Sequence, residues 1–265
     1  MTDASQEPPG LARRLIAGWP GDIVVAGAFL TRLPFRLRAG ASLGDLAQAA
    51  RACPLIGLGI GALGGAALWL ADGTGLGPQA ATLIGLAVMA WLTGALHEDG
   101  LAHVADAMGG ASRERRLAIM RDSRIGSFGV VALIFAIGIK WAAISGLPGS
   151  ATAWAAMAAA AALSRAVMVP CMAMLRPARA DGLGHGAGRP DGLGAALALA
   201  LGGVFAVVLL GWGVGLAALG AALLAVIVLG RVAEARFGGY TGDVLGAVQQ
   251  VAECFVLIAV GGLMP

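Results

Sequence analysis

The chain is poor in charged and aromatic residues. Only 12% of its 265 residues are charged and 5% are aromatic, with a single tyrosine. Soluble domains carry about 25% charged residues, so the low charge argues against an ordinary soluble domain. The net charge is +3, but no extended patch of basic and aromatic residues accompanies it. This absence argues against a nucleic-acid-binding protein.

Cysteine is also scarce. Cys53, Cys171 and Cys254 lie far apart, each at or within an apolar segment. Their number is odd, and no pair has the spacing of a zinc site or of a disulfide framework. We interpret them as buried, unreactive thiols. Residues 1–10 are polar and acidic and lack the basic and apolar regions of a signal peptide, so we expect insertion to depend on internal segments.

Apolar residues are abundant instead. They make up 58% of the chain, which also contains 43 glycines. A helix needs about 20 apolar residues to cross the hydrocarbon core, and small residues allow such helices to pack closely. The sequence therefore predicts an all-α, polytopic membrane helix bundle formed by a single domain over 1–265. Its expected seven crossings are 54–71, 80–96, 129–147, 151–175, 193–211, 213–230 and 244–263.

The connections between these segments alternate in charge. Arginine occurs in 36–52, 98–128, 176–192 and 231–243, whereas lysine and arginine are both missing from 72–79, 146–150 and 211–215. Basic connections stay in the cytoplasm. We therefore expect the four basic segments on the cytoplasmic side and the C-terminus outside.

The N-terminal part fits this alternation less well. Residues 1–19 form a polar segment, and 22–35 is short and apolar with arginines on both sides. Because both flanks are basic, we expect an amphipathic or re-entrant helix on the cytoplasmic side. A crossing with the N-terminus outside is the alternative.

Three charged residues fall within the expected crossings: Lys140, Arg165 and Glu253. Each costs about 2.5–3.5 kcal/mol at the centre of an inserted helix, so we expect them to face the bundle interior. They form either an internal ion pair, such as Lys140 with Glu253, or a contact to substrate. The glycine-rich segment 176–192 is either a flexible cytoplasmic loop that acts as a lid or an ordinary connector.

The carboxylates are densest just after the second apolar run. If its helix continues, Asp99, His103 and Asp106 are spaced i, i+4 and i+7 and share one face, with Glu98 adjacent. Carboxylate oxygens at a membrane surface suit a hard cation such as Mg²⁺. Gly100 would let a polyphosphate approach the backbone.

Phosphate-binding residues follow this acidic run. Arg121, Asp122 and Arg124 precede a glycine turn, and arginine binds phosphate oxygens through paired hydrogen bonds. Carboxylates followed by arginines predict a phosphoryl-transfer site. The alternative is that the arginines only anchor a cytoplasmic loop, which is our interpretation of Arg113, Arg115 and Arg116. A zinc protease is excluded because HExxH needs a histidine where Leu101 stands.

Two central segments, His97-Glu-Asp-Gly-Leu-Ala to Asp106 and Ile119-Met-Arg-Asp-Ser-Arg-Ile-Gly126, resemble the cobalamin synthase family (adenosylcobinamide-GDP ribazoletransferase). Weaker matches occur in the family's order at 29–34, 163–166, 178–184 and 241–246. Together these segments cover nearly the whole chain, and the two central ones are the specific ones.

The resemblance implies an enzyme of the bacterial inner membrane that acts in the last steps of cobalamin assembly, with its active site facing the cytoplasm. It would join adenosylcobinamide-GDP to α-ribazole or α-ribazole 5′-phosphate and release GMP, with Mg²⁺ as cofactor. Its expected partners are these substrates and the lipid bilayer. Self-association, or association with other cobalamin-assembly enzymes, stays open. The alternatives are a CDP-alcohol phosphotransferase, whose Asp-Gly-x-x-Ala-Arg pattern is incomplete here, and a membrane transporter.

We expect the site residues to divide their roles as follows. Asp99 and Asp106 bind the metal, Glu98 is a ligand or the base, and Asp122 is a further ligand or base. Asp243 completes the site, and Arg124 clamps the diphosphate. Arg32, Arg121 and Arg165 are candidates for substrate contact. The family usually has aspartate where this chain has His103, which we keep among the metal-site residues. Histidine is a poorer ligand for Mg²⁺, so either His103 contacts the ligands or the substrate, or this chain has reduced or altered metal use.

Overall fold

The computed structural model describes residues 18–37, 45–180 and 186–264. The described residues form helices and no strand, apart from one isolated bridge between Pro177 and Tyr240. The predicted all-α bundle is confirmed. Most of the predicted segment 1–19 lies outside the described residues, as do 181–185 of the predicted loop 176–192.

Six helical segments are long and apolar enough to cross a membrane. The first joins α3 (Asp45–Ala49), η1 (Ala50–Ala52) and α4 (Cys53–Asp72). The others are α8 (Ser127–Ser145), α9 (Ser150–Met174), α11 (Gly192–Leu210), α12 (Trp212–Phe237) and α13 (Gly242–Leu263). The chain is therefore a multi-pass membrane protein with six such segments among the described residues, and with seven if the bent pair of α5 and α6 is counted as one crossing.

The bent pair corrects the expectation of one continuous crossing over 80–96 that extends into the acidic run. The helix α5 (Pro78–Thr93) ends before the acidic residues, and α6 (Leu96–Ala107) leaves it at an angle of 89°. Gly94 and Ala95 both have left-handed backbones, with φ of 64° and 57°. An α-helix cannot continue through two such residues. The acidic residues therefore lie on a separate short helix.

The central helix of the bundle is α9, and most of its residues are buried. The helix α4 packs against the alanine-rich surface of α9. The two helices are so close that a Cβ atom on Gly57 or Gly61 would collide with the backbone of α9. Glycine facing alanine brings two membrane helices together over a large area. This packing places Arg165 of α9 in the interior of the protein.

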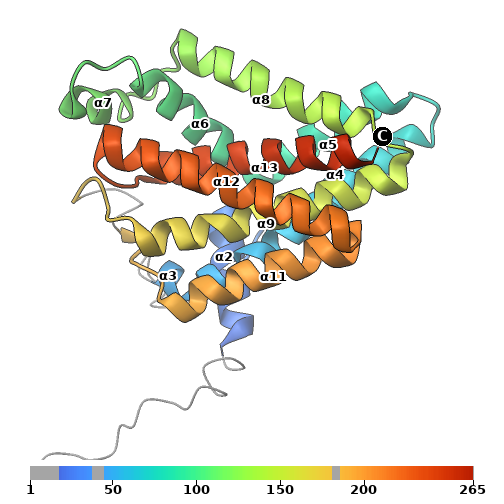
Figure 1. The fold of residues 1–265 in the computed structure, drawn as a ribbon, viewed down its shortest axis with the longest axis horizontal. Coiled ribbons are helices and arrows are strands. Elements are labelled where there is room, and N and C mark those ends of the chain that lie inside the picture. Colours follow the sequence, from blue (N-terminus) through green and yellow to red (C-terminus); the bar gives the residue numbers. More distant parts are fainter. Residues whose placement is uncertain (1–17, 38–44, 181–185, 265) are drawn as a thin grey trace, which may run out of the picture.

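The loops separate into two groups at opposite ends of the bundle. Figure 1 shows α7 (Arg113–Ile119), α3 and the connections that carry arginine at one end, with the C-terminus and the bare connections at the other. This arrangement agrees with the predicted alternation of basic and bare loops. It also places α6 and the start of α13 at the basic end.

The N-terminal apolar segment forms α2 (Trp19–Leu30), a 12-residue helix. A helix of this length extends about 18 Å, too short for the roughly 30 Å hydrocarbon core, so the alternative of a crossing here loses support. Buried Asp22 binds Arg51 at 2.7 Å, and the Arg51 guanidinium lies 4.5 Å from the ring centre of Trp19. These contacts attach α2 to the start of α4.

Candidate active site where α6 meets α13

The helix α6 packs against the first two turns of α13 through glycines. A Cβ atom on Gly100 would lie 2.8 Å from the carbonyl oxygen of Asp243 and 3.1 Å from Cα of Gly246. Gly100 is buried in this contact. The expectation that Gly100 lets a polyphosphate approach the backbone is therefore wrong. The residue allows two helices to meet, and this contact brings Asp243 beside the acidic helix.

Three of the predicted site residues come together here. Nε2 of His103 lies 3.4 Å from Oδ1 of Asp99, one turn apart on α6. Asp243 lies within electrostatic range of both. Its Oδ2 accepts a hydrogen bond from Nη2 of Arg179 at 3.2 Å. The side chain of Asp99 is 58% exposed, whereas His103 is buried. Two carboxylates from separate helices thus share one accessible place.

The donors at this place fit a hydrated magnesium ion better than a fully enclosed metal. Within the described part of the chain, no three acidic, histidine or cysteine side chains are arranged to hold an ion together. Mg²⁺ in phosphoryl-transfer sites is commonly bound by one or two carboxylates, with water and substrate phosphates as the other ligands. Asp99 and Asp243 suit that arrangement, and Mg²⁺ itself stays a prediction.

Asp106 lies on the same helix but has a different environment. Its Oδ2 accepts the backbone N–H of Gly126 at 2.7 Å, and its Oδ1 accepts that of Gly129 at 2.9 Å. These amides belong to the start of α8, where a carboxylate satisfies free N–H groups and the helix dipole. The structure therefore gives Asp106 a capping role, and its role as a metal ligand stays a prediction.

Asp122 and Arg124 bind each other in the exposed loop that follows α7. Nη2 of Arg124 lies 2.6 Å from Oδ2 of Asp122, and its Nε lies 3.0 Å from Oδ1. The hydrogen bonds from Arg124 lower the pKa of Asp122 to about 2, so the carboxylate is charged at neutral pH. Asp122 is also within electrostatic range of His103, which places this loop near Asp99. Arg121 is exposed in the same loop.

Glu98 and Arg165 lie deeper, in a buried polar network. Lys140 of α8 donates to Gln250 at 2.7 Å and to Glu253 at 3.0 Å, so the predicted pairing of Lys140 with Glu253 is confirmed. Arg165 lies 3.8 Å from Glu253. Gln250 also donates to Oε1 of Glu98 at 2.9 Å. Glu98 therefore points into the bundle, whereas its neighbour Asp99 lies at the surface.

The last predicted residue, Arg32, lies at the junction of α5 and α6. Its backbone N–H donates to the carbonyl of Leu92 at 2.8 Å, and its side chain packs directly over Gly94. Arg32 is exposed. It occupies the bend from which the acidic helix starts, and its contact with substrate stays a prediction.

Residues 22–261 match the family described as cobalamin-5-phosphate synthase. The chain is 42% identical to the adenosylcobinamide-GDP ribazoletransferase of Bradyrhizobium diazoefficiens over 238 residues, which are 89% of this chain and 92% of that protein. It is 43% identical to the protein of the same name from Azorhizobium caulinodans over 251 residues, covering 90% of this chain and 94% of that one. No solved structure matches the chain.

The chain belongs to the cobalamin-5-phosphate synthase family. The resemblance drawn from the two central motifs is thereby confirmed, and the matches give no support to a CDP-alcohol phosphotransferase or a transporter.

The structure adds to this synthase two residues that the sequence did not single out as site residues. Arg179, which lies within the motif 178–184, holds Asp243. Gln250 bridges Lys140 and Glu98. Two adjacent glutamines inside an apolar crossing are costly in a bilayer, and that cost was the available signal for Gln250. No comparable signal marked Arg179 among the other loop arginines.

Arg113, interpreted from the sequence as a topological anchor, joins three loops of this synthase. Its Nε donates to the carbonyl of Phe237 at 2.7 Å and its Nη2 to that of Ala178 at 3.2 Å. The loops also pair directly through their backbones. The backbone N–H of Tyr240 donates to the carbonyl of Arg176, and the backbone N–H of Ala178 donates to the carbonyl of Tyr240. The end of α12 and the loop after α9 are thus fixed beside Asp243.

Proposed function

We propose that this chain joins adenosylcobinamide-GDP to α-ribazole or α-ribazole 5′-phosphate and releases GMP, at the cytoplasmic face of the bacterial inner membrane. Membership in the synthase family supports the substrates. The observation that carries the site is the meeting of Asp99 and Asp243 at the end of the bundle where the basic loops gather. Positive loops favour the cytoplasmic side for that end.

The reaction transfers a phosphoryl group between two oxygens. A ribose hydroxyl of the ribazole forms, through its oxygen, a bond to the phosphorus attached to cobinamide, and the bond from that phosphorus to the oxygen of GMP breaks. The attacking hydroxyl loses its proton, and the GMP phosphate leaves with the electron pair. Bound Mg²⁺ would supply charge stabilisation on the diphosphate.

The residues of this chain would hold and orient the reactants. Asp99 is the more exposed carboxylate of the pair with Asp243, so it can bind the metal or accept the proton of the hydroxyl. Arg179 keeps Asp243 in place through their 3.2 Å contact. Arg124 and Asp122 lie in an exposed loop. A diphosphate binds a guanidinium in the same paired manner as a carboxylate, so Arg124 can release Asp122 and bind the diphosphate instead.

The direct test uses purified protein with adenosylcobinamide-GDP, α-ribazole and Mg²⁺, and measures GMP and cobalamin. We expect turnover that EDTA abolishes, and a loss of at least about 100-fold for Asp99→Asn or Asp243→Asn because each removes a charge from the reaction centre. Arg115→Ala, in an exposed part of α7, serves as the control. Near-normal turnover in both aspartate variants would remove the metal site, and release of CMP from a CDP-alcohol would favour the alternative enzyme.

His103 provides a second test of the same site. Because the family usually has aspartate at this position, we expect His103→Asp to keep or raise Mg²⁺-supported GMP release. A clear loss, with the protein still folded, would show that the histidine has its own role beside Asp99.

A further inference from the structure

A cavity of about 230 Å³ lies inside the bundle next to the proposed reaction centre. Its wall on the α5 side is apolar and includes Leu86, Met89 and Ala90. Its opposite side is polar and is formed by Glu98, Lys140, Arg165, Gln250 and Glu253. Such a mixture of one apolar wall and several convergent polar groups is typical of small-molecule sites.

The polar side of this cavity has unused hydrogen-bonding capacity. Arg165 and Glu253 are each only 2% exposed, yet Nε of Arg165 and Oε1 of Glu253 have no hydrogen-bond partner within the described residues, and neither does Oε2 of Glu98. Buried polar atoms without partners are rare and costly in folded proteins. The three atoms comprise one donor and two acceptors, so they suit a ligand that both accepts and donates.

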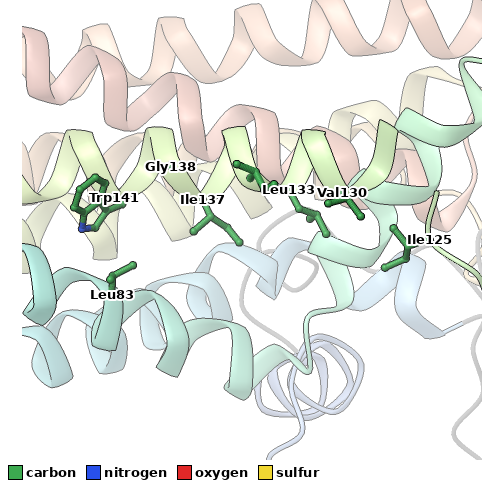
Figure 2. A pocket seen from close by; sticks show the side chains of 8 residues that line it. Leu83, Ile125, Val130, Leu133, Ile137, Gly138 and Trp141 are labelled. Carbon is green, nitrogen blue, oxygen red and sulfur yellow. The ribbon is translucent and has the colours of Figure 1, made fainter. Parts of the chain in front are cut away.

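An apolar groove lies on the outside of this cavity. Figure 2 shows the groove along α8, with Leu133, Ile137 and Trp141 on one side and Leu83 of α5 on the other. The groove and the cavity share Leu83 and Ile137. At the far end the two helices are joined, because Trp141 donates to the carbonyl of Gln79 at 3.0 Å. The groove and the cavity therefore adjoin between α5 and α8.

The size of the cavity limits the ligand. Pockets for drug-sized molecules measure about 300–1,000 Å³, so a space of about 230 Å³ accepts a group no larger than a bicyclic ring with part of a sugar. It excludes a corrin macrocycle and a guanosine diphosphate. The guanosine and adenosine groups of the corrinoid substrate also end in a bicyclic base, but the edges of a purine carry several polar groups. The dimethylbenzimidazole of the ribazole is apolar apart from one free ring nitrogen, so it matches the apolar residues of α5 best.

We propose that this cavity binds the base and the adjoining part of the ribose of the acceptor nucleoside, an assignment that rests on the proposed function. The apolar wall of α5 packs on the bicyclic base, and the ring nitrogen accepts from Nε of Arg165. Ribose hydroxyls donate to the free oxygens of Glu98 and Glu253. Glu98 lines the cavity and Asp99 is the next residue of α6, so a nucleoside held here lies beside the reaction centre and can direct a ribose hydroxyl toward it. Glu98 is then a substrate-binding residue.

The test fills the cavity from its apolar side and leaves the charged residues unchanged. We expect Ala90→Leu to raise the KM for α-ribazole by about tenfold or more, since excess volume in a fitted pocket costs this much binding energy. The KM for adenosylcobinamide-GDP and the thermal unfolding temperature should stay near those of the unchanged protein. Ala200→Leu, the same change at an exposed position of α11, is the matched control.

The outcomes separate this proposal from the proposed function. Absence of GMP release by the unchanged protein would contradict the function itself, whereas normal turnover with an unchanged KM for α-ribazole in Ala90→Leu would overturn only the cavity assignment. If only the KM for adenosylcobinamide-GDP rises, the cavity binds the corrinoid substrate, and this result too would overturn the assignment of the cavity to the nucleoside. The affinity for α-ribazole can also be measured without corrinoid and compared with that for ribose 5-phosphate, which lacks the base. This measurement does not depend on turnover. If Ala90→Leu does not fold, Ala90→Val and Arg165→Lys address the same question.

Discussion

The carboxylate of Asp106 accepts two backbone N–H groups at the start of α8, one on each oxygen. Gly126 and Gly129 make this possible, because a Cβ atom on either would come within 2.6 Å of that carboxylate. The spacing i, i+4, i+7 correctly placed Asp106 on the face of Asp99 and His103. Spacing alone could not show that a neighbouring helix end, brought in by the chain after Arg124, already binds its oxygens.

This contact predicts that Asp106→Asn destabilises the protein. The amide can accept with only one oxygen and turns its NH₂ group toward a backbone N–H, so we expect a loss of roughly 1–2 kcal/mol in unfolding free energy. Thermal unfolding in detergent measures it. An unchanged Mg²⁺ concentration for half-maximal activity, in contrast to Asp99→Asn, would show that capping α8 is the only role of Asp106. A strongly raised Mg²⁺ requirement would instead make Asp106 a metal ligand.

The ion pair of Asp122 with Arg124 leads to a prediction on pH. The pKa of Asp122 in the folded protein is about 2, below the ordinary aspartate value near 3.9. The stability from this shift is therefore present above about pH 4 and is lost as the pH falls through 2. Because the Arg124 side chain is 86% exposed, solvent screening makes that contribution small.

We expect Arg124→Gln to return the pKa of Asp122 toward the ordinary aspartate range, because the hydrogen bonds and charge of the guanidinium are its main cause. Titration of labelled aspartate carboxyl signals by NMR measures the shift, with Arg115→Gln as the control. An unchanged pKa in Arg124→Gln would show that another group stabilises the carboxylate.

At the scale of helices, α6 and α13 depend on glycine where they meet. A Cβ atom on Gly100 would come within 2.8 Å of a backbone oxygen, and the atoms around it belong to backbone that cannot turn away. We expect Gly100→Ala to cost about 1–3 kcal/mol in stability and to reduce turnover by shifting Asp99 from Asp243. Gly230→Ala has no atom within 4 Å of its new Cβ and should be neutral or stabilising. Equal thermal stability in the two variants would contradict this packing.

The sequence predicted most of the helices but not the break between α5 and α6. Long apolar runs bounded by glycine or charge are sufficient to locate α8, α9, α11, α12 and α13. Gly94 permits a left-handed helix end, but it lies within an apolar run and is followed by Ala95, which favours helix. Local preference alone therefore does not predict two left-handed residues in a row. The turn is fixed by tertiary contacts, with Arg32 packed over Gly94 and bonded to Leu92. Neighbouring residues of a helix point about 100° apart, and the way α6 lies after the bend turns Glu98 into the bundle and leaves Asp99 at the surface.

At the scale of the whole molecule, the two ends of the bundle differ in charge. The arginine-bearing loops gather with α6 and α7 at one end, and the bare connections gather at the other (Figure 1). All three native cysteines are buried, so the protein should give little background labelling with a thiol reagent that does not cross membranes. Single cysteines introduced into exposed loops can then report on which side each end lies.

We expect Thr74→Cys, in the bare connection after α4, to be labelled in intact spheroplasts. Ser123→Cys, in the loop between α7 and α8, should be labelled only after permeabilisation, because positively charged loops are retained in the cytoplasm. Both positions are exposed in the structure, so a difference between them reports on the membrane barrier and not on burial. Labelling of Ser123→Cys in intact spheroplasts would place Asp99 and Asp243 on the outside, where no cytoplasmic nucleotide-linked substrate could reach them.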